Sequence, residues 1–271
     1  MKLEYNIRSL YTPVQPAVIG TNGEVSYIEL PSDAQLQDFI YCYWNLKTIK
    51  PLDNIYNYRV VADGCIDIVF NCTNYDETYI MGYCNSFMKI GIDKEFNYFG
   101  IRFLPGIFPL LFNIDASELS NHYEHLNTVQ PYLFQVIQQL GYKCFCFQDL
   151  CNELNIYFIN HLNKMDKLFD NRFYYALGTI LKRKGLINIE KDLNDGISSR
   201  HLQRLFNFYI GDTAKSFCRV VRFQALLQAD PSLKSIKAEK SFFDFGYYDQ
   251  THFIKEFKRF YGETPSKIAA E

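Results

Sequence analysis

The sequence predicts an α+β protein: an N-terminal β-rich barrel or sandwich with flanking helices, then an all-α domain of two helix-turn-helix units joined by a long helix. Three observations favour this fold class. The 271 residues are 48% hydrophobic and 17% aromatic, which is enough to build packed cores in about two domains. The apolar spacing changes from a period of 2 to one of 3.6 after residue 105. Charge also divides the chain, because residues 1–170 hold 11 Lys and Arg against 19 Asp and Glu, whereas residues 171–271 hold 17 against 11.

The formal net charge of -2 therefore combines an acidic front with a basic C-terminal third. Such asymmetry is typical of a chain whose basic part meets a polyanion, either nucleic acid or an anionic membrane, although compositional drift would produce the same numbers. No run approaches the roughly 18 apolar residues of a spanning helix, and the first residues lack the layout of a secretory signal. We expect a cytoplasmic protein without a membrane partner, whose eight cysteines are thiols.

The first 110 residues are expected to be mainly β. Runs rich in β-branched and aromatic residues, punctuated by Asp-Gly and Asn turns, predict strands over 24–30, 58–61, 66–71, 78–81, 88–92 and 98–104. Between the first two, Leu36, Phe39, Ile40 and Tyr43 recur at helical spacing. This spacing predicts a helix over 31–44 that covers one open side of the sheet.

Helices are expected from residue 105 onward. Pro105 and Pro109 open a short helix, and the acidic residues of 115–118 begin another. Amphipathic patterns predict further helices over 131–140, 147–162 and 171–184. Gly141 and Gly185 stand where the first and the last of these three should stop.

Residues 192–206 have the layout of a helix-turn-helix. Gly196 supplies a turn between a segment containing Ile189 and Leu193 and a helix that Ser198 can cap. Leu202, Leu205 and Phe206 would form its inner face. The outward residues are of the types that reach guanine, adenine and phosphate from a helix in a major groove: Ser199, Arg200, Gln203, Arg204 and Asn207.

A second unit repeats this layout. Residues 235–245 are predicted to be helical, Gly246 supplies the turn, and Asp249 can cap a helix over 250–261. The inner face is aromatic, with Phe253, Phe257 and Phe260. The outer face carries Gln250, Thr251, Ile254, Lys255 and Lys258, which can contact adenine, guanine, a thymine methyl and phosphate.

A helix over 213–229 is expected between the two units, because this stretch holds neither Gly nor Pro. At ~1.5 Å per residue it would be about 24 Å long. A rigid spacer of this kind can set two recognition helices about one DNA turn apart, ~34 Å. One chain could then read two successive major-groove segments.

The two helix-turn-helix segments of this sequence resemble those of AraC/XylS-type transcriptional regulators. The resemblance is carried by Phe245-Gly-Tyr-Tyr-Asp-Gln-Thr-His-Phe-Ile-Lys-Glu-Phe-Lys-Arg-Phe-Tyr-Gly-Glu-Thr-Pro-Ser266, by the residues of 198–211, and by Phe217 with Arg222-Phe-Gln-Ala225. It covers about residues 172–268 and implies two helix-turn-helix units on a long helix. It also implies base and phosphate contacts from Arg200, Gln203, Arg204, Gln250, Thr251, Ile254 and Lys255.

Two positions depart from that family's pattern. The family usually places a small residue where the first helix of each unit crosses the second, and the matching positions here are Asp192 and Phe242. Either the register is shifted by one residue, which would bring Leu193 into that place, or both units pack unusually. A buried Asp192 without a partner would destabilise the first unit by a few kcal/mol.

The N-terminal half is similar to a poorly characterised domain that precedes some members of the family. The likeness lies in Cys42-Tyr-Trp44 and in the residues of 59–71 and 100–106. In family members such a domain usually senses a small molecule or mediates dimerisation. We therefore expect a sensor or dimerisation domain (1–115), a helical connector or dimerisation segment (116–170) and a double helix-turn-helix domain (171–271). The expected partners are double-stranded DNA, a small-molecule effector, a second copy of the chain and RNA polymerase.

Two places in the sequence hold residues of the kinds found in catalytic or metal sites. The run Asp63-Gly64-Cys65-Ile66-Asp67 could supply paired carboxylates or a nucleophile, but residues 1–121 hold no His to activate Cys65, so a turn and strand are favoured. Cys144, Cys146 and Cys151 with His161 match no strong metal pattern. We expect no catalytic residue, metal or cofactor. The competing hypotheses are a DNA-targeted enzyme and a thiol-based redox sensor.

Two arginines and the N-terminal aromatics leave the ligand question open. Arg59 and Arg102 lie in apolar strand contexts, so each should pair with Asp63, Asp67 or a ligand anion, and an internal Arg–Asp pair is favoured. The aromatic residues of the same half could line a ligand pocket or fill a solid core.

Overall fold

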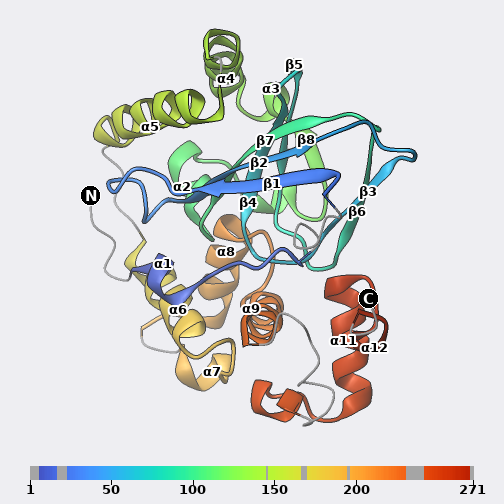
Figure 1. Ribbon diagram of the computed structural model, residues 1–271. Coiled ribbons are helices and arrows are strands. Elements are labelled where there is room, and N and C mark those ends of the chain that lie inside the picture. The colour runs from blue at the N-terminus through green and yellow to red at the C-terminus, as the bar shows by residue number, and fades with distance from the viewer. Residues whose placement is uncertain are drawn as a thin grey trace.

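The computed structural model describes residues 6–16, 23–144, 146–165, 170–193, 196–229 and 241–268. Two layers are seen in Figure 1: a β-rich N-terminal part with helices above it, and a helical C-terminal part below. The α+β class with a β-rich front and a helical back is confirmed. No helix in the described ranges is long and apolar enough to cross a bilayer.

The N-terminal part is built on a six-stranded antiparallel sheet. Its spatial order is β1 (Val25–Leu30), β2 (Ile40–Thr48), β7 (Asn97–Phe103), β4 (Ile66–Asn71), β5 (Asn74–Met81) and β8 (Tyr123–His125). Two further strands, β3 (Tyr56–Val60) and β6 (Met88–Ile92), pair as a separate ribbon. The strand β8 was not expected from the sequence, because its three residues are too few to show a period.

The predicted helix over 31–44 is wrong. The chain makes a tight turn near Leu36, whose carbonyl accepts from the amides of Phe39 and Ile40, and then enters β2. The run Ile40-Tyr-Cys-Tyr-Trp44 favours a strand by its β-branched and aromatic content. β2 lies inside the sheet between β1 and β7, and its side chains are buried on both faces, Tyr43 on one and Trp44 on the other. The alternation that would have identified a strand is therefore absent.

One face of the sheet is covered by helices. The main ones are α2 (Ile107–Phe112), α4 (Pro131–Lys143) and α5 (Phe147–Asn163), with η2 (Ala116–Leu119) and α3 (Leu126–Val129) between them. Rings of the sheet pack on rings of α5, with centroids 5.1 Å apart for Phe99 and Phe147 and 5.7 Å for Phe103 and Phe158. The expectation that Gly141 ends α4 is wrong, because this residue lies inside the helix. A Cβ at this position would overlap the Tyr75 ring.

The β3–β6 ribbon faces the other side of the sheet. A second apolar cluster forms there, in which Trp44 and Leu46 of the sheet pack with Tyr58 and Ile92 of the ribbon. Gly100 lies beneath the Trp44 indole, and a Cβ at that position would overlap the ring. The sheet is therefore lined by helices on one face and by an aromatic layer on the other.

The C-terminal part is arranged around one long helix. Its elements are α6 (Asn171–Lys182), α7 (Ile189–Asp192), α8 (Ser199–Tyr209), α9 (Ala214–Ala229), η3 (Ser241–Phe245), α11 (Gln250–Tyr261) and α12 (Pro265–Ile268). Phe217 of α9 packs on Phe206 of α8, and Phe223 of α9 packs on Phe257 of α11. The predicted spacer helix is confirmed, and it contacts both of the helices that it separates.

Candidate nucleic-acid interface

The helix α8 begins where the sequence predicts. Gly196 has a φ of +75°, and the Ser198 hydroxyl accepts a hydrogen bond from the His201 amide at 3.3 Å. This cap satisfies one of the free amides of the first turn. Leu202, Leu205 and Phe206 are buried, as expected for the inner face. The α8 helix therefore has a fixed start and a fixed rotation about its axis.

The predicted outer face of α8 points to solvent. Ser199, Arg200, Gln203 and Arg204 are exposed, and Asn207 is half-buried. Arg204 Nη2 lies 3.0 Å from His201 Nδ1. This contact holds the guanidinium along the helix and gives His201 a structural role. The face can present four polar side chains to a groove without any rearrangement of the core.

The helix α11 repeats this arrangement. Its cap is Asp249, whose Oδ1 accepts from the His252 amide at 2.7 Å, and the residues of its inner face, Phe253, Phe257 and Phe260, are buried. Gln250, Thr251, Lys255 and Lys258 are exposed and Ile254 is half-buried. The structure therefore collects the second set of predicted residues on one helix face.

A buried carboxylate on α11, Glu256, was not expected from the sequence. The Glu256 side chain is 1% exposed and forms an ion pair with Arg219 of α9, and Arg222 Nη2 lies 3.8 Å from Glu256 Oε2. Arg222 is also stacked over the Tyr247 ring and donates to the Gly246 carbonyl. These contacts join α9, the turn before α11 and α11 itself. The helical spacing of positions 253, 256, 257 and 260 places Glu256 on the inner face and could have identified it.

The two positions that depart from the family pattern pack without an unpaired charge. Asp192 is half-buried, accepts from the Asn188 amide at 2.8 Å and lies 3.1 Å from Arg183. Leu193 is buried, which agrees with a register shift by one residue. Phe242 is buried and stacks on Phe253 with ring centroids 5.1 Å apart. The rest of the predicted 235–245 helix, up to residue 240, lies outside the described residues.

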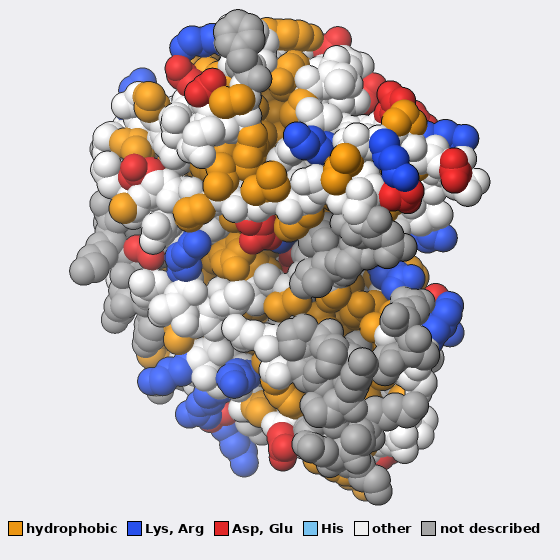
Figure 2. Space-filling view, in the orientation of Figure 1, with side chains coloured by type: hydrophobic (Ala, Val, Ile, Leu, Met, Phe, Trp, Pro, Cys, Tyr) orange, Lys and Arg blue, Asp and Glu red, His pale blue; other side chains and the backbone are white. Residues whose placement is uncertain are grey.

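Basic side chains gather on a second surface that was not singled out from the sequence. Figure 2 shows Lys and Arg over α6 and α7, at the lower left of the view. Lys182, Lys184 and Lys191 are exposed there, while Arg183 is paired with Asp192. The only sequence signal for the three lysines was the overall charge of the C-terminal third.

Tyr248, in the turn before α11, is 87% exposed.

The C-terminal end of α11 rests on the N-terminal part. Arg259 donates to the carbonyl and to Oδ1 of Asn85, both at 2.9 Å, and the Ala62 amide donates to the Phe260 carbonyl. The sequence-based pairing of Arg59 with an internal Asp is wrong. Arg59 lies over the Tyr261 ring and 3.9 Å from Glu263, because its strand passes beside the end of α11 rather than over Asp63.

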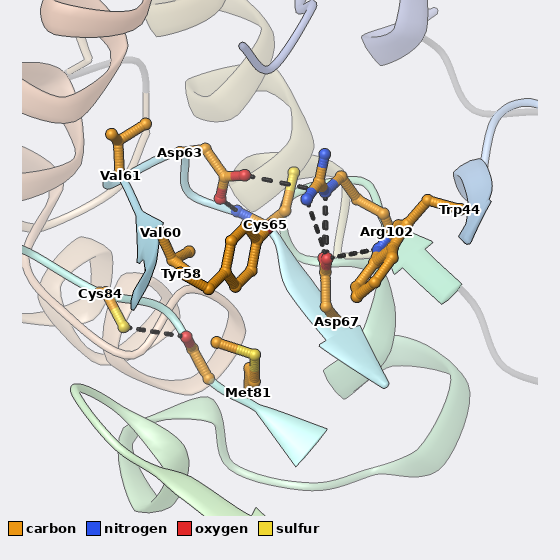
Figure 3. Close-up of a pocket in the computed structure, with 11 residues that line it drawn as sticks. Trp44, Tyr58, Val60, Val61, Asp63, Cys65, Asp67, Met81, Cys84 and Arg102 are labelled. Carbon is orange, nitrogen blue, oxygen red and sulfur yellow. Dashed lines mark hydrogen bonds and ion pairs between the residues drawn. The ribbon is translucent and has the colours of Figure 1, made fainter. Parts of the chain in front are cut away.

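The internal Arg–Asp pair is confirmed for Arg102. Its Nε and Nη2 donate to Asp67 at 3.0–3.2 Å, Asp63 lies 3.8 Å away, and Trp44 Nε1 donates to Asp67 at 3.0 Å (Figure 3). Burial raises the pKa of the Asp67 carboxyl to about 6. Burial also raises the pKa of the Cys65 thiol well above its usual value, so little thiolate forms there. These groups behave as a structural cluster.

No cluster in the described ranges resembles a metal centre. Cys146 caps α5 through its sulfur, Cys151 is buried, and His161 Nε2 contacts the Leu111 carbonyl at 3.1 Å. Cys146, Cys151 and His161 therefore have separate contacts in the structure.

Two family profiles match the chain. A helix-turn-helix domain matches residues 195–271, and a domain of unknown function (DUF6597) matches residues 28–125. No curated protein gives a significant match. Among solved structures, the chain is similar to a crystal structure of apo ToxT from Vibrio cholerae, with 12% identity, a TM-score of 0.34, and coverage of 91% of this chain and 96% of that chain. The interval 28–125 contains nearly all of the sheet and its ribbon, and the interval 195–271 contains the helices α8, α9 and α11.

Proposed function

We propose that this chain is a DNA-binding transcription regulator of the AraC type, and that it reads two adjacent major-groove segments through α8 and α11. One observation supports this best. Two capped helices, each with a buried inner face and an exposed polar outer face, are fixed to the same long helix α9. We place the DNA-binding domain at residues 171–271.

The outer faces divide into base-reading and phosphate-binding side chains. Arg200, Gln203 and Arg204 on α8 have the donors and acceptors that pair with guanine and adenine edges. Gln250, Thr251, Ile254 and Lys255 do the same on α11, with Ile254 placed for a thymine methyl. Phosphate contacts come from Ser199, Asn207 and Lys258, and from the exposed lysines 182, 184 and 191.

We propose that the N-terminal domain controls how the two helices are held. The loop 61–65 touches both halves of the DNA-binding domain: the Ala62 amide donates to Phe260 of α11, and the Ala62 carbonyl accepts from Gln224 of α9 at 2.8 Å. Gly64 lies against the Phe217 ring. A change in this loop, through a small-molecule effector or a second copy of the chain, would therefore shift α9 and α11 together.

Selection of binding sites from a random duplex pool tests the proposal. The full chain should enrich one motif of roughly 20 base pairs, whose affinity falls by about a thousandfold or more between ~50 and ~200 mM salt. The matched control is Arg200→Ala combined with Arg204→Ala, two changes confined to the exposed face of α8. Recovery of no motif by the full chain would contradict sequence-specific binding. Enrichment of the same motif by the double variant would contradict the role of α8.

A further inference from the structure

A cavity of about 240 Å³ lies between the β3–β6 ribbon and the six-stranded sheet. Aromatic residues dominate its wall: Trp44, Tyr58, Tyr79, Tyr98 and Tyr123. Aliphatic side chains and Met81 complete the lining. Its size suits a small molecule, and its aromatic faces carry negative electrostatic potential.

Glu77 supplies the ionisable carboxylate in this wall. Its two oxygens accept from the side-chain amides of Asn71 and Asn74, both at 3.0 Å, and in the described part of the chain it forms no ion pair. The amides orient the carboxylate but do not neutralise it. No Lys or Arg is among the described residues that line the cavity.

The neighbouring buried groups add to the negative potential. Trp44, Tyr58 and Met81 also line the smaller cavity of Figure 3, where the two carboxylates of Asp63 and Asp67 face the one guanidinium of Arg102. Burial, with a further contribution from the Glu77 charge, raises the pKa of Tyr98, so that phenol stays neutral. An anionic ligand would meet repulsion from both sides of the shared wall, whereas a cation would meet attraction.

We propose that this cavity binds an organic cation, with an alkylated ammonium group held by cation–π contact with Trp44 and the tyrosines and by the charge of Glu77. A desolvated ammonium is attracted by the π-electrons of an aromatic ring, and five aromatic residues line the same space here. The site lies in the N-terminal part of the chain, away from the exposed faces of α8 and α11.

Trp44 makes the test direct, because it is the single tryptophan of the chain. The full chain is titrated at constant ionic strength with choline, with the larger benzyltrimethylammonium, and with 3,3-dimethyl-1-butanol, the uncharged isostere of choline. Trp44 fluorescence should change saturably with both cations, and the isostere should bind at least about tenfold more weakly than choline. An absence of saturable change with both cations, or equal binding of choline and its isostere, would overturn the proposal.

Variants separate the site from a general charge effect. Glu77→Gln keeps the shape of the side chain and should weaken choline binding at least fivefold. Its matched control is Glu118→Gln, an exposed carboxylate in η2 outside the cavity, which should leave binding unchanged. Tyr123→Ala should also weaken binding, and because this side chain is 54% exposed, the fold should be retained, as circular dichroism would verify. Equal effects of Glu77→Gln and Glu118→Gln would contradict the assignment. No DNA enters this test, so its failure leaves the regulator proposal standing.

Discussion

At the residue scale, the second helix-turn-helix unit depends on a buried charge. Glu256 is 1% exposed, and Arg219 and Arg222 approach it from α9. Removing one partner of such a group leaves the others in a low-dielectric site without compensation, which is more destabilising than loss of a surface pair. The same contacts set the position of α11 on α9, and therefore of the side chains that α11 presents.

Glu256→Ala should lower the free energy of unfolding by about 3 kcal/mol, because two arginines lose their buried counter-charge. Urea denaturation followed by circular dichroism measures this. The control Glu190→Ala removes an exposed carboxylate from α7 and should change the free energy of unfolding by less than about 0.5 kcal/mol. Similar values for the two variants would show that the Glu256 cluster contributes no more than a surface pair.

The cysteines should resist oxidation and alkylation. Burial raises the pKa of Cys72, Cys151 and Cys218 to about 12 each, so at pH 8 only about one molecule in ten thousand carries each thiolate. Their alkylation rates should rise about tenfold per pH unit from pH 8 to pH 11, with the exposed Cys146 labelled first. Peptide mass spectrometry after timed iodoacetamide treatment reads this order. Fast labelling of a buried thiol at pH 7 would instead favour the redox-sensor hypothesis.

At the element scale, the sequence predicted the elements that have their own local signals. The caps Ser198 and Asp249, the turns at Gly196 and Gly246 and the inner faces of α8 and α11 are all confirmed, because each is set by neighbouring residues. The strand β2 was missed because its two faces are covered by the helices on one side and by the β3–β6 ribbon on the other, so its sequence shows no alternation. The apolar residues of 36–43 recur at helical spacing by coincidence. Pairing with β1 and with β7, which is distant in sequence, makes Ile40–Thr48 a strand.

The cap of α11 offers a test at this scale. Asp249→Ala removes the acceptor of the His252 amide and should lower the free energy of unfolding by about 1 kcal/mol. Asp249→Asn retains an acceptor in the same place and should recover most of that loss. Thermal unfolding of both variants measures the difference. Equal unfolding of the two variants would mean that the cap does not stabilise the helix.

At the scale of the whole molecule, the two parts are joined by polar contacts that no local pattern predicts. Gln224 on α9 is 1% exposed, and its side chain bonds the amide and carbonyl of Val14 and the carbonyl of Ala62. Gln15 bonds Val61 and Asp63 beside it. These partners lie about 50 to 210 positions apart in sequence, which is why the likeness of each half to a known domain could not reveal how the halves meet.

Gln224→Ala should lower the free energy of unfolding by about 3 kcal/mol, because it leaves buried backbone groups of Val14 and Ala62 without partners. Gln228→Ala, an exposed change on the same helix, is the control and should be nearly neutral. Urea unfolding of both variants provides the comparison. If Gln224→Ala is as neutral as Gln228→Ala, these contacts do not hold the two parts together.

The central claim is that α8 and α11 read separate major-groove segments, and binding-site selection with one variant in each helix tests it most directly. Gln203→Ala should lose base preference in one half of the enriched motif only, and Gln250→Ala in the other half only, with the halves about one DNA turn apart and a loss of ~1–3 kcal/mol at the affected positions. Lys258→Ala should weaken all sites alike and leave the motif intact. Loss of the same positions in both glutamine variants, or a motif with one half only, would contradict the account.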